Sequence, residues 1–297
     1  MKRLVVIAGP TAVGKTAAAI EVAQAVGTEI VSCDSRQFYS EMSIGVARPT
    51  ASELAAVPHH FIACRSAAEP YNAYTYEHEA LALLEQLFEV HDTVVAVGGS
   101  GLYINALCLG INYLPDPAPE LRARLSQRIA DGDLPAMLQE LQQLDPVYYE
   151  QVDRRNPIRI QRALEVILTA GCPYSELVGK PLQPRPFEVL LFALHCERDE
   201  LRDRIYRRTD QMIADGLVDE VASLLPLRTL NTLNTVGYRE IFDHLDGLCS
   251  LADATTAIKN HTWQYAKKQM TWLKQYDTIT WVERKKISNI LQVLDNK

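Results

Sequence analysis

Residues Gly9 to Thr16 read Gly-Pro-Thr-Ala-Val-Gly-Lys-Thr and match the phosphate-binding pattern G-x-x-x-x-G-K-[ST] at every fixed position. In such a loop the glycines let backbone N–H groups turn toward an anion. Lys15 adds a positive charge, and the Thr16 hydroxyl can bind Mg²⁺. The sequence therefore predicts a phosphate-binding loop, with Thr16 as its metal-binding residue, made of Gly9, Pro10, Thr11, Ala12, Val13, Gly14, Lys15 and Thr16.

The segments that flank this loop have the order that a phosphate site requires. Residues 4–8, Leu-Val-Val-Ile-Ala, form a short apolar run typical of a buried parallel strand. Residues 17–26 have a composition typical of a helix, and Gly27 is a typical terminator. The alternative is a chance Gly-Lys-Thr at the entry of an apolar helix. The order of strand, loop and helix disfavours that alternative.

Strands and helices alternate through the first third of the chain. The pattern predicts a strand at 29–32, a helix at 76–90 and a strand at 93–97. Polar loops follow two of the strands, at Asp34–Gln37 and at Gly98–Gly101. Because ligands bind outside the carboxyl ends of strands in open α/β sheets, we expect these loops to converge with the phosphate loop.

Two proline-rich joints interrupt the alternation, one around Pro115 to Pro119 and one from Lys180 to Pro186. The segments between them have helical patterns at 120–129, 134–144 and 157–170, the last with Asn156 as N-cap and Gly171 as terminator. We therefore expect an all-helical insertion at 116–184, hinged by prolines so that it can move as a lid.

The fold class that follows is α/β, with a P-loop-containing parallel sheet flanked by helices and a small all-helical insertion. Residues 1–115 form the first part of the core and 185–297 its continuation. In that continuation we expect a strand at 187–194 and then helices at 199–215 and 253–276.

The composition favours a water-soluble enzyme. The chain has 297 residues, a net charge of −7 and no apolar stretch long enough to cross a bilayer. We expect a cytoplasmic monomer that does not bind membranes. Arginines and lysines nevertheless cluster locally, and these clusters alone leave RNA binding and solvated helix faces as equal alternatives.

The cysteines and histidines give little sign of a metal centre. The six cysteines are scattered, without the spacing of a zinc site or a disulfide framework. His59 and His60 are adjacent, and neighbouring side chains in an extended segment point to opposite faces. We interpret this pair as structural.

Several motifs together resemble one family, the tRNA dimethylallyltransferases. The resemblance runs from residue 9 to about residue 275, and it is specific because the motifs occur in this combination and order. Ser100 departs from the threonine usual in the family but keeps the hydroxyl. The motifs are Gly9–Thr16, Asp34-Ser35-Arg36-Gln37 with Tyr39, Pro58-His59-His60, Gly98–Tyr103, Arg162–Val166, Val236–Glu240 and Lys268–Lys274.

The resemblance implies transfer of a dimethylallyl group from dimethylallyl diphosphate to N6 of adenosine 37, in tRNAs that read codons starting with U. The loop, Lys15 and Mg²⁺ on Thr16 would stabilise the leaving diphosphate. By family analogy Arg208 reaches the same diphosphate, with Arg204 as the alternative. Asp34 is the candidate general base, because the amine must lose a proton. Ser100 would position the diphosphate or the amine.

Asp34 has a structural alternative, since a carboxylate beside the loop can also bind a water of Mg²⁺ or cap a helix. Trp272 likewise suits either an RNA contact or a helix core. The resemblance and the basic clusters imply that the following residues bind the tRNA anticodon stem-loop: Asp34, Ser35, Arg36, Gln37, Ser100, Arg122, Ile158, Arg159, Ile160, Gln161, Arg162, Gly237, Tyr238, Arg239, Lys268, Trp272 and Lys274.

Three other functions compete with this interpretation. A P-loop kinase that binds ATP would transfer phosphate and has no use for a basic helical insertion. An adenylate prenyltransferase would modify a free nucleotide, which offers the insertion nothing to hold. An RNA-binding module with a vestigial P-loop is disfavoured because Lys15, Thr16 and Asp34 are all present.

Overall fold

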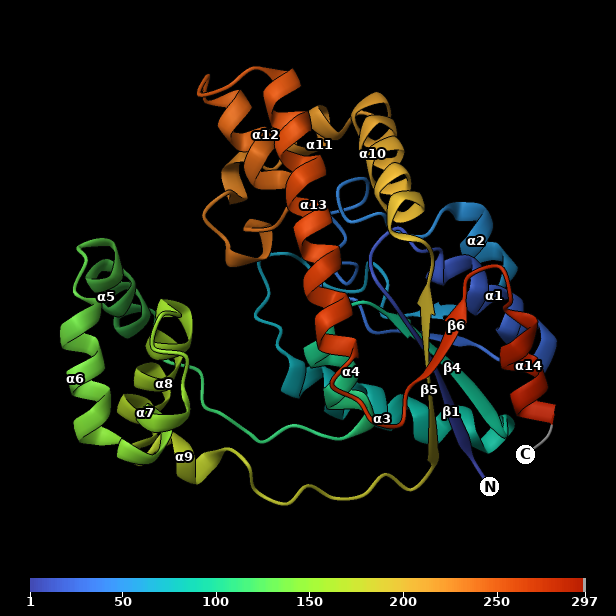
Figure 1. Ribbon diagram of the computed structural model, residues 1–297, viewed down its shortest axis with the longest axis horizontal. Coiled ribbons are helices and arrows are strands. Elements are labelled where there is room, and N and C mark those ends of the chain that lie inside the picture. The colour runs from blue at the N-terminus through green and yellow to red at the C-terminus, as the bar shows by residue number, and fades with distance from the viewer. Residues whose placement is uncertain (296–297) are drawn as a thin grey trace. The chain divides into compact units, whose positions relative to one another are not determined.

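The computed structural model describes residues 1–295 and consists of two compact units (Figure 1). The core unit comprises residues 1–109 and the chain from Arg185 onward, and the helical unit comprises Gly110–Pro184. The helical unit thus begins earlier than residue 116, the start that the sequence predicts. Residues 110–118 have no regular secondary structure, yet they group with the helices that follow. The first proline-rich segment therefore lies inside the helical unit.

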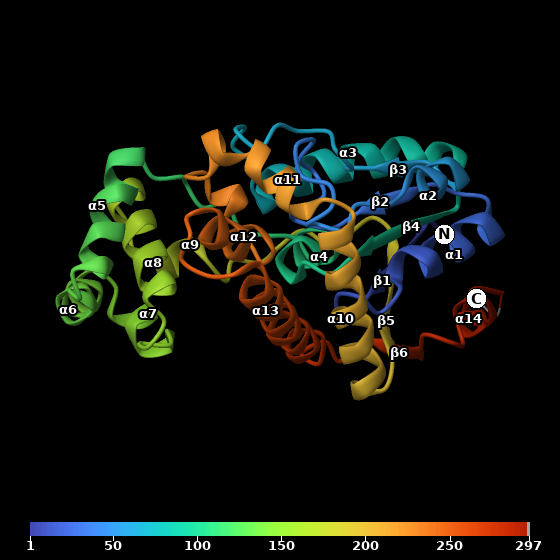
Figure 2. The same ribbon diagram turned by 90° about the horizontal axis from the view of Figure 1, so that it is seen from above.

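A six-stranded sheet forms the centre of the core unit, and every strand pair in it is parallel. Its spatial order is β3-β2-β4-β1-β5-β6, which Figure 2 shows from top to bottom. The strands are β1 (Arg3–Ala8), β2 (Ile30–Ser32), β3 (His59–His60), β4 (Thr93–Gly98), β5 (Glu188–His195) and β6 (Thr280–Glu283).

The strand register brings the three predicted loops to one edge of the sheet. Ala8 of β1 pairs with Gly98 of β4, and Ser32 of β2 pairs with Val97. The chain leaves these three neighbouring strands at the same level, so their loops must meet there. This confirms the convergence predicted from the strand pattern.

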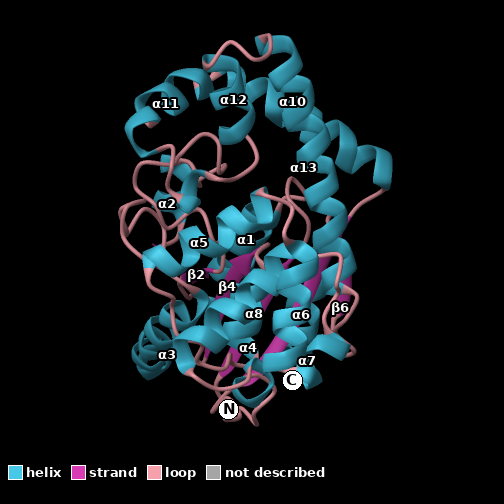
Figure 3. Cartoon of the chain, turned by 90° about the vertical axis from the view of Figure 1, so that its left-hand side faces the viewer, coloured by secondary structure: helices cyan, strands magenta, loops and turns pink. Residues whose placement is uncertain are grey.

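Helices cover both faces of this sheet (Figure 3). Ile30 packs with buried residues of α1, whereas the hydroxyl of Tyr76 in α3 contacts Ser32 O and Cys33 Sγ, both at 3.0 Å. Because side chains alternate along a strand, α1 and α3 lie on opposite faces. The core-unit α-helices are α1 (Lys15–Val26), α2 (Ala51–Ala56), α3 (Ala73–Val90), α4 (Gly101–Cys108), α10 (Arg198–Ala214), α11 (Leu217–Ser223), α12 (Tyr238–Leu245), α13 (Leu251–Leu273) and α14 (Ser288–Asp295).

The helical unit has an apolar core of its own. Leu125, Met137, Leu141 and Leu164 are fully buried in it. Asn156 caps α8 by accepting a hydrogen bond from the Arg159 N–H at 3.3 Å, as the sequence predicts. The helices are α5 (Pro119–Ala130), α6 (Leu134–Leu144), α7 (Pro146–Gln151), α8 (Pro157–Ala170) and α9 (Tyr174–Leu177).

Helix α13 begins before the predicted residue 253 and ends before 276. Ser250 accepts a hydrogen bond from the Asp253 N–H at 3.1 Å, and the Asp253 side chain in turn accepts from Ser250. Asp253 is therefore the third residue of the helix and part of its capping box. No helix within residues 1–295 is long and apolar enough to cross a bilayer.

Candidate active site

The phosphate loop joins β1 to α1 and is held in shape by its own residues. Gly14 has φ +101°, a left-handed conformation that glycine adopts at little steric cost. Lys15 Nζ donates a hydrogen bond to Pro10 O at 2.9 Å. Burial lowers the pKa of Lys15 to about 8, while Asp34 raises it and Arg208 lowers it further. The loop thus presents a buried lysine to the cavity beside it.

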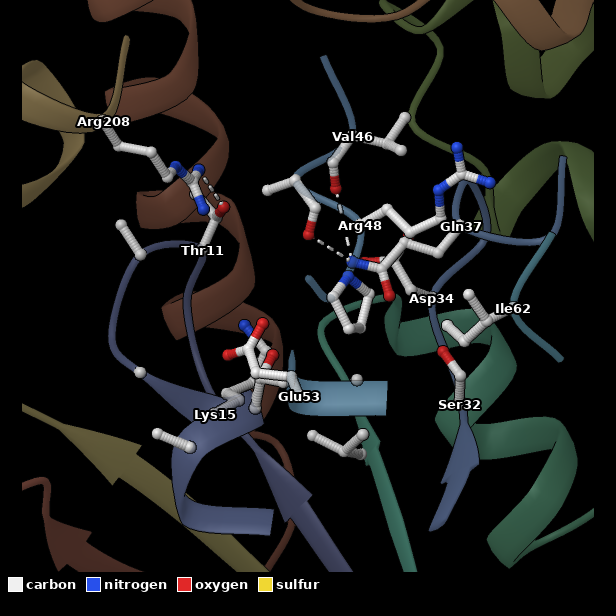
Figure 4. A pocket seen from close by; sticks show the side chains of 18 of the residues that line it. Thr11, Lys15, Ser32, Asp34, Gln37, Val46, Arg48, Glu53, Ile62 and Arg208 are labelled. Carbon is white, nitrogen blue, oxygen red and sulfur yellow. Dashed lines mark hydrogen bonds between the residues drawn. The ribbon is translucent and has the colours of Figure 1, made fainter. Parts of the chain in front are cut away.

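Two arginines of α10 reach the same loop. Arg208 Nη2 donates to Thr11 Oγ1 at 2.6 Å (Figure 4). Arg204 Nε donates to Ala12 O at 2.7 Å. Burial lowers the pKa of Arg208 to about 10, although Asp34 raises it, so the guanidinium stays charged at neutral pH. Both arginines are therefore placed beside the phosphate loop.

Asp34 follows β2, and its carboxylate accepts a hydrogen bond from the backbone N–H of Arg36 at 2.9 Å. Ser100, from the loop after β4, joins this segment. Its Oγ accepts from the backbone N–H of Ser35 at 2.9 Å and donates to Ser35 Oγ at 3.1 Å. The structure thus links the Asp34 loop to the Ser100 loop.

Two cavities meet at Asp34. The larger, which we call the P-loop cavity, has a volume of about 570 Å³, and the smaller, the second cavity, about 220 Å³. Thr16 lines only the P-loop cavity, whereas Tyr265 lines only the second. The residues that line both are Thr11, Asp34, Val46, Ala47 and Arg208. A group bound in either cavity can therefore lie next to Asp34.

The side chains of Arg36 and Gln37 are engaged inside the core unit. Arg36 Nη1 donates to Thr232 O at 3.0 Å. Gln37 Nε2 donates to the carbonyl oxygens of Val46 and Ala47, at 3.3 and 3.0 Å (Figure 4). These bonds fix the loop that lines both cavities. Base reading by Arg36 and Gln37 stays a prediction.

Two predicted tRNA-binding residues have no side-chain surface to offer. Ile160 and Tyr238 are both fully buried. The Tyr238 hydroxyl donates to Glu220 Oε1 at 2.6 Å, and Ile160 lies in the core of the helical unit. Both side chains are therefore packed inside the protein, and tRNA binding at these two positions stays a prediction. Gly237, also buried, donates its N–H to Glu240 and begins α12.

Other predicted RNA-binding residues differ in how far they are available. Arg122, Gln161 and Arg162 converge on the buried carboxylate of Glu165. These ion pairs and this hydrogen bond within the helical unit already use some of the N–H groups that could donate to RNA. The predicted residues whose side chains are exposed are Arg122, Ile158, Arg159, Arg239, Lys268 and Lys274, of which Arg122 and Arg239 also form ion pairs.

Trp272 is half-buried against the Ser100 loop. A Cβ atom at Gly101 would lie 2.3 Å from its indole, so only glycine allows this close packing. The indole also makes an edge contact with Tyr276 at 4.9 Å between ring centroids. Trp272 therefore has a packing role, and a contact with RNA stays a prediction.

The sequence analysis included Gln269 in the Lys268–Lys274 motif but gave it no role, and the structure shows that it bridges two loops of the site. Its Oε1 accepts from the Thr11 N–H and its Nε2 donates to Gly99 O, both at 2.8 Å. The side chain is buried on α13. Both partners are far away in sequence, so no local pattern could reveal the contact.

Glu220 of α11 was missed for the same reason. Its carboxylate accepts from the backbone N–H groups of Ser43, Ile44 and Gly45, at 3.1, 2.7 and 3.1 Å. The Tyr238 hydroxyl donates to it as well. Glu220 thereby anchors the loop whose next residues line both cavities.

The two adjacent histidines, which the sequence analysis interpreted as structural, lie in different surroundings. His60 does bind Glu29 at 2.6 Å, but His59 lines the P-loop cavity. Within residues 1–295 no group of three or more His, Cys, Asp or Glu side chains can hold a metal ion. A metal in this cavity would therefore need oxygen ligands from other sources.

Comparisons with known proteins agree with this architecture. The family model for IPP transferase matches residues 37–276. The chain is 43% identical to tRNA dimethylallyltransferase 1 of Bacteroides thetaiotaomicron, over 99% of this chain and 96% of the relative. It is 42% identical to tRNA dimethylallyltransferase of Christiangramia forsetii, over 99% and 98%.

Solved structures give the same result. The tRNA isopentenylpyrophosphate transferase of Bacillus halodurans superposes with a TM-score of 0.72 at 33% identity, covering 100% of this chain and 96% of that one. A eukaryotic dimethylallyltransferase that acts on tRNA superposes with a TM-score of 0.79 at 24% identity, covering 97% and 75%, a likeness of fold. The chain therefore belongs to the IPP transferase family, among the tRNA dimethylallyltransferases, and it is a transferase.

Proposed function

We propose that the protein transfers a dimethylallyl group from dimethylallyl diphosphate to N6 of adenosine 37, in tRNAs that read codons starting with U. The observation that carries this proposal is the position of Asp34, which lines both cavities between the phosphate loop and Tyr265. The printed names of the relatives, tRNA dimethylallyltransferase, support the choice of prenyl donor and acceptor.

The phosphate loop is suited to a leaving diphosphate. As the C1–O bond of the donor breaks, its electron pair stays on the diphosphate oxygen, where negative charge grows. Lys15 and Arg208 supply positive charge beside that oxygen, and the loop adds backbone N–H groups. These fixed charges lower the barrier, because they stabilise the transition state, in which negative charge grows on the leaving oxygen, more than they stabilise the unreacted donor.

The residues of the P-loop cavity fit Mg²⁺. The hydroxyl of Thr16 lines the cavity, and Glu53 adds a carboxylate to the lining, the ligand type that Mg²⁺ prefers. Ser32 Oγ is buried beside them without a hydrogen-bond partner. When bound to Thr16, the ion would add positive charge at the diphosphate.

Asp34 is suited to take the proton that N6 loses. As the new N6–C1 bond forms, the nitrogen becomes positive and must release a proton. The Asp34 carboxylate is within the same cavity system, and the Arg36 N–H holds one of its oxygens. Ser100 orients this loop through Ser35. Asp34 then acts as the general base.

The acceptor base must leave its stack to reach Asp34, as is general for enzymes that modify bases. Exposed Arg159 of the helical unit and Lys268 and Lys274 of α13 are suited to bind RNA phosphates. Because tRNA is the proposed acceptor, we place the protein in the cytoplasm. We also propose that the protein is a monomer.

The experiment that tests the proposal follows two labels. Dimethylallyl diphosphate is labelled either in the prenyl carbon or in phosphorus, and incubated with the protein, Mg²⁺ and unmodified tRNA. We expect the carbon label on the tRNA and the phosphorus label in free diphosphate. Phosphorus on the acceptor would identify a kinase, and carbon on free AMP but not on tRNA would identify an adenylate prenyltransferase.

A further inference from the structure

The walls of the P-loop cavity differ in their hydrogen-bonding chemistry. The side formed by the phosphate loop and α10 carries donors, namely Lys15, Arg204 and Arg208. Other residues that line the same cavity, in or next to β2, β3 and α2, carry acceptor atoms, and these are Ser32, Asp34, Glu53 and His59. A diphosphate needs donors, so it uses the first side. The acceptors need a different occupant, one that donates hydrogen bonds.

Ser32 is the clearest of these acceptors. It is the last residue of β2, its side chain is 1% exposed, and it lines the cavity (Figure 4). Its Oγ is buried and has no hydrogen-bond partner. A buried hydroxyl without a partner is unfavourable, so a bound ligand that supplies the partner is held more tightly.

His59 has a second buried atom without a partner. Its Nδ1 lies 2.8 Å from Val57 O, and because a carbonyl oxygen only accepts, Nδ1 carries the hydrogen. The lone pair is therefore on Nε2, which is buried and unpartnered. Burial lowers the pKa of His59, and His60 lowers it further although Val57 and Glu53 raise it, which favours the neutral ring. Nε2 is thus an acceptor.

The two atoms lie on the same side of the sheet. Ile30 pairs with His59 across β2 and β3, and Ser32 follows Ile30 by two residues. Side chains two residues apart, and those in register, share a face. Ile30 packs with α1, whose first turn contains Thr16. Ser32 and His59 therefore share the face of the sheet that α1 covers.

We propose that Ser32 and His59 accept hydrogen bonds from water molecules of a hydrated Mg²⁺ ion that Thr16 and the diphosphate hold. Mg²⁺ keeps several waters when it binds protein, and these waters are donors that require acceptors. The inference deepens the proposed function and rests on its diphosphate site. It also explains why the cavity has polar atoms that neither the diphosphate nor the transferred proton uses.

The test measures metal binding rather than turnover. The affinity of Mn²⁺ for the protein saturated with inorganic diphosphate is read from the electron paramagnetic resonance of free Mn²⁺. We expect Ser32→Ala and His59→Leu each to weaken Mn²⁺ binding by about tenfold. His59→Gln, which places an oxygen near the Nε2 position, should restore most of the affinity. Diphosphate binding with the metal chelated should not change in any variant.

Thr28→Val is the matched control. Thr28 Oγ1 is also buried without a partner, but the residue does not line the cavity. Its variant should bind Mn²⁺ like the parent protein. Parental Mn²⁺ affinity in both Ser32→Ala and His59→Leu would overturn the inference, as would equal loss in Thr28→Val. Prenyl transfer by the parent protein, measured separately, shows whether the proposed function stands when this inference fails.

Discussion

At the scale of single residues, the central claim concerns the carboxylate of Asp34. Asp34→Asn keeps the size of the side chain and an oxygen for the Arg36 N–H, but it removes the proton acceptor. We expect kcat to fall by about 10²- to 10⁴-fold, with little change in tRNA affinity. Single-turnover transfer and tRNA binding by filter retention measure the two effects. Lost tRNA binding with normal turnover would instead show that Asp34 recognises RNA.

The lowered pKa of Lys15 predicts how the affinity for diphosphate changes with pH. In the ligand-free protein its pKa is lowered to about 8, mainly by burial, so its charge is lost as the pH rises above 8. We therefore expect the affinity for inorganic diphosphate, measured by equilibrium dialysis with metal chelated, to fall between about pH 8 and 10. Diphosphate itself becomes more negative over this range, which alone would tighten binding. Affinity that rises with pH would contradict the prediction.

The same pKa also predicts in which direction the free energy of unfolding changes with pH. The folded protein loses the Lys15 proton near pH 8, whereas the unfolded chain keeps it up to about 10.5. Between these values the unfolded state binds more protons, so this residue makes the protein more stable as the pH rises. Below about pH 8 both states are protonated and the burial penalty on the charge is fully present.

At the scale of elements, α13 positions two loops of the site through one side chain. Gln269 accepts from the Thr11 N–H and donates to Gly99 O. In Gln269→Glu a carboxylate oxygen would face the Gly99 carbonyl oxygen, so we expect the loops to separate and kcat/KM to fall by at least about tenfold. Gln264→Glu, an exposed change on the same helix, is the control and should keep parental kcat/KM. If both variants kept the parental kcat/KM, the Gln269 bridge would not contribute to catalysis.

The elements that could be predicted from the sequence were those marked by a motif or by a run of residues within the element itself. The strand before the phosphate loop and the helix after it, β1 and α1, follow from an apolar run and a helical composition, and the structure confirms them. Phosphate binding by the loop stays a prediction. The short strand β6 was missed because Thr280 and Trp281 are exposed and give no apolar run. Gln269 could not be found because its partners lie 258 and 170 residues away. The burial of Tyr238 could not be predicted, because a motif indicates that a residue matters without indicating that it is buried.

At the scale of the whole molecule, the helical unit carries the predicted RNA contact. Arg159 is exposed on α8, whereas Arg162 is paired with the buried Glu165, so replacing Arg162 would also disturb folding. We expect Arg159→Ala to weaken tRNA binding and to reduce the slope of log K against log salt by about one. Arg154→Ala is the control, because Glu150 neutralises Arg154 at 2.6 Å. An unchanged slope for Arg159→Ala would remove this residue from the interface.

The most direct test of the account is the mass of the modified nucleoside. Unmodified tRNAs are incubated with the complete protein, dimethylallyl diphosphate and Mg²⁺, then digested and analysed by mass spectrometry. We expect the mass of one dimethylallyl group, replacing one hydrogen, on adenosine 37 of tRNAs that read codons starting with U. Adenosine 37 with unchanged mass in all tRNAs would contradict the account.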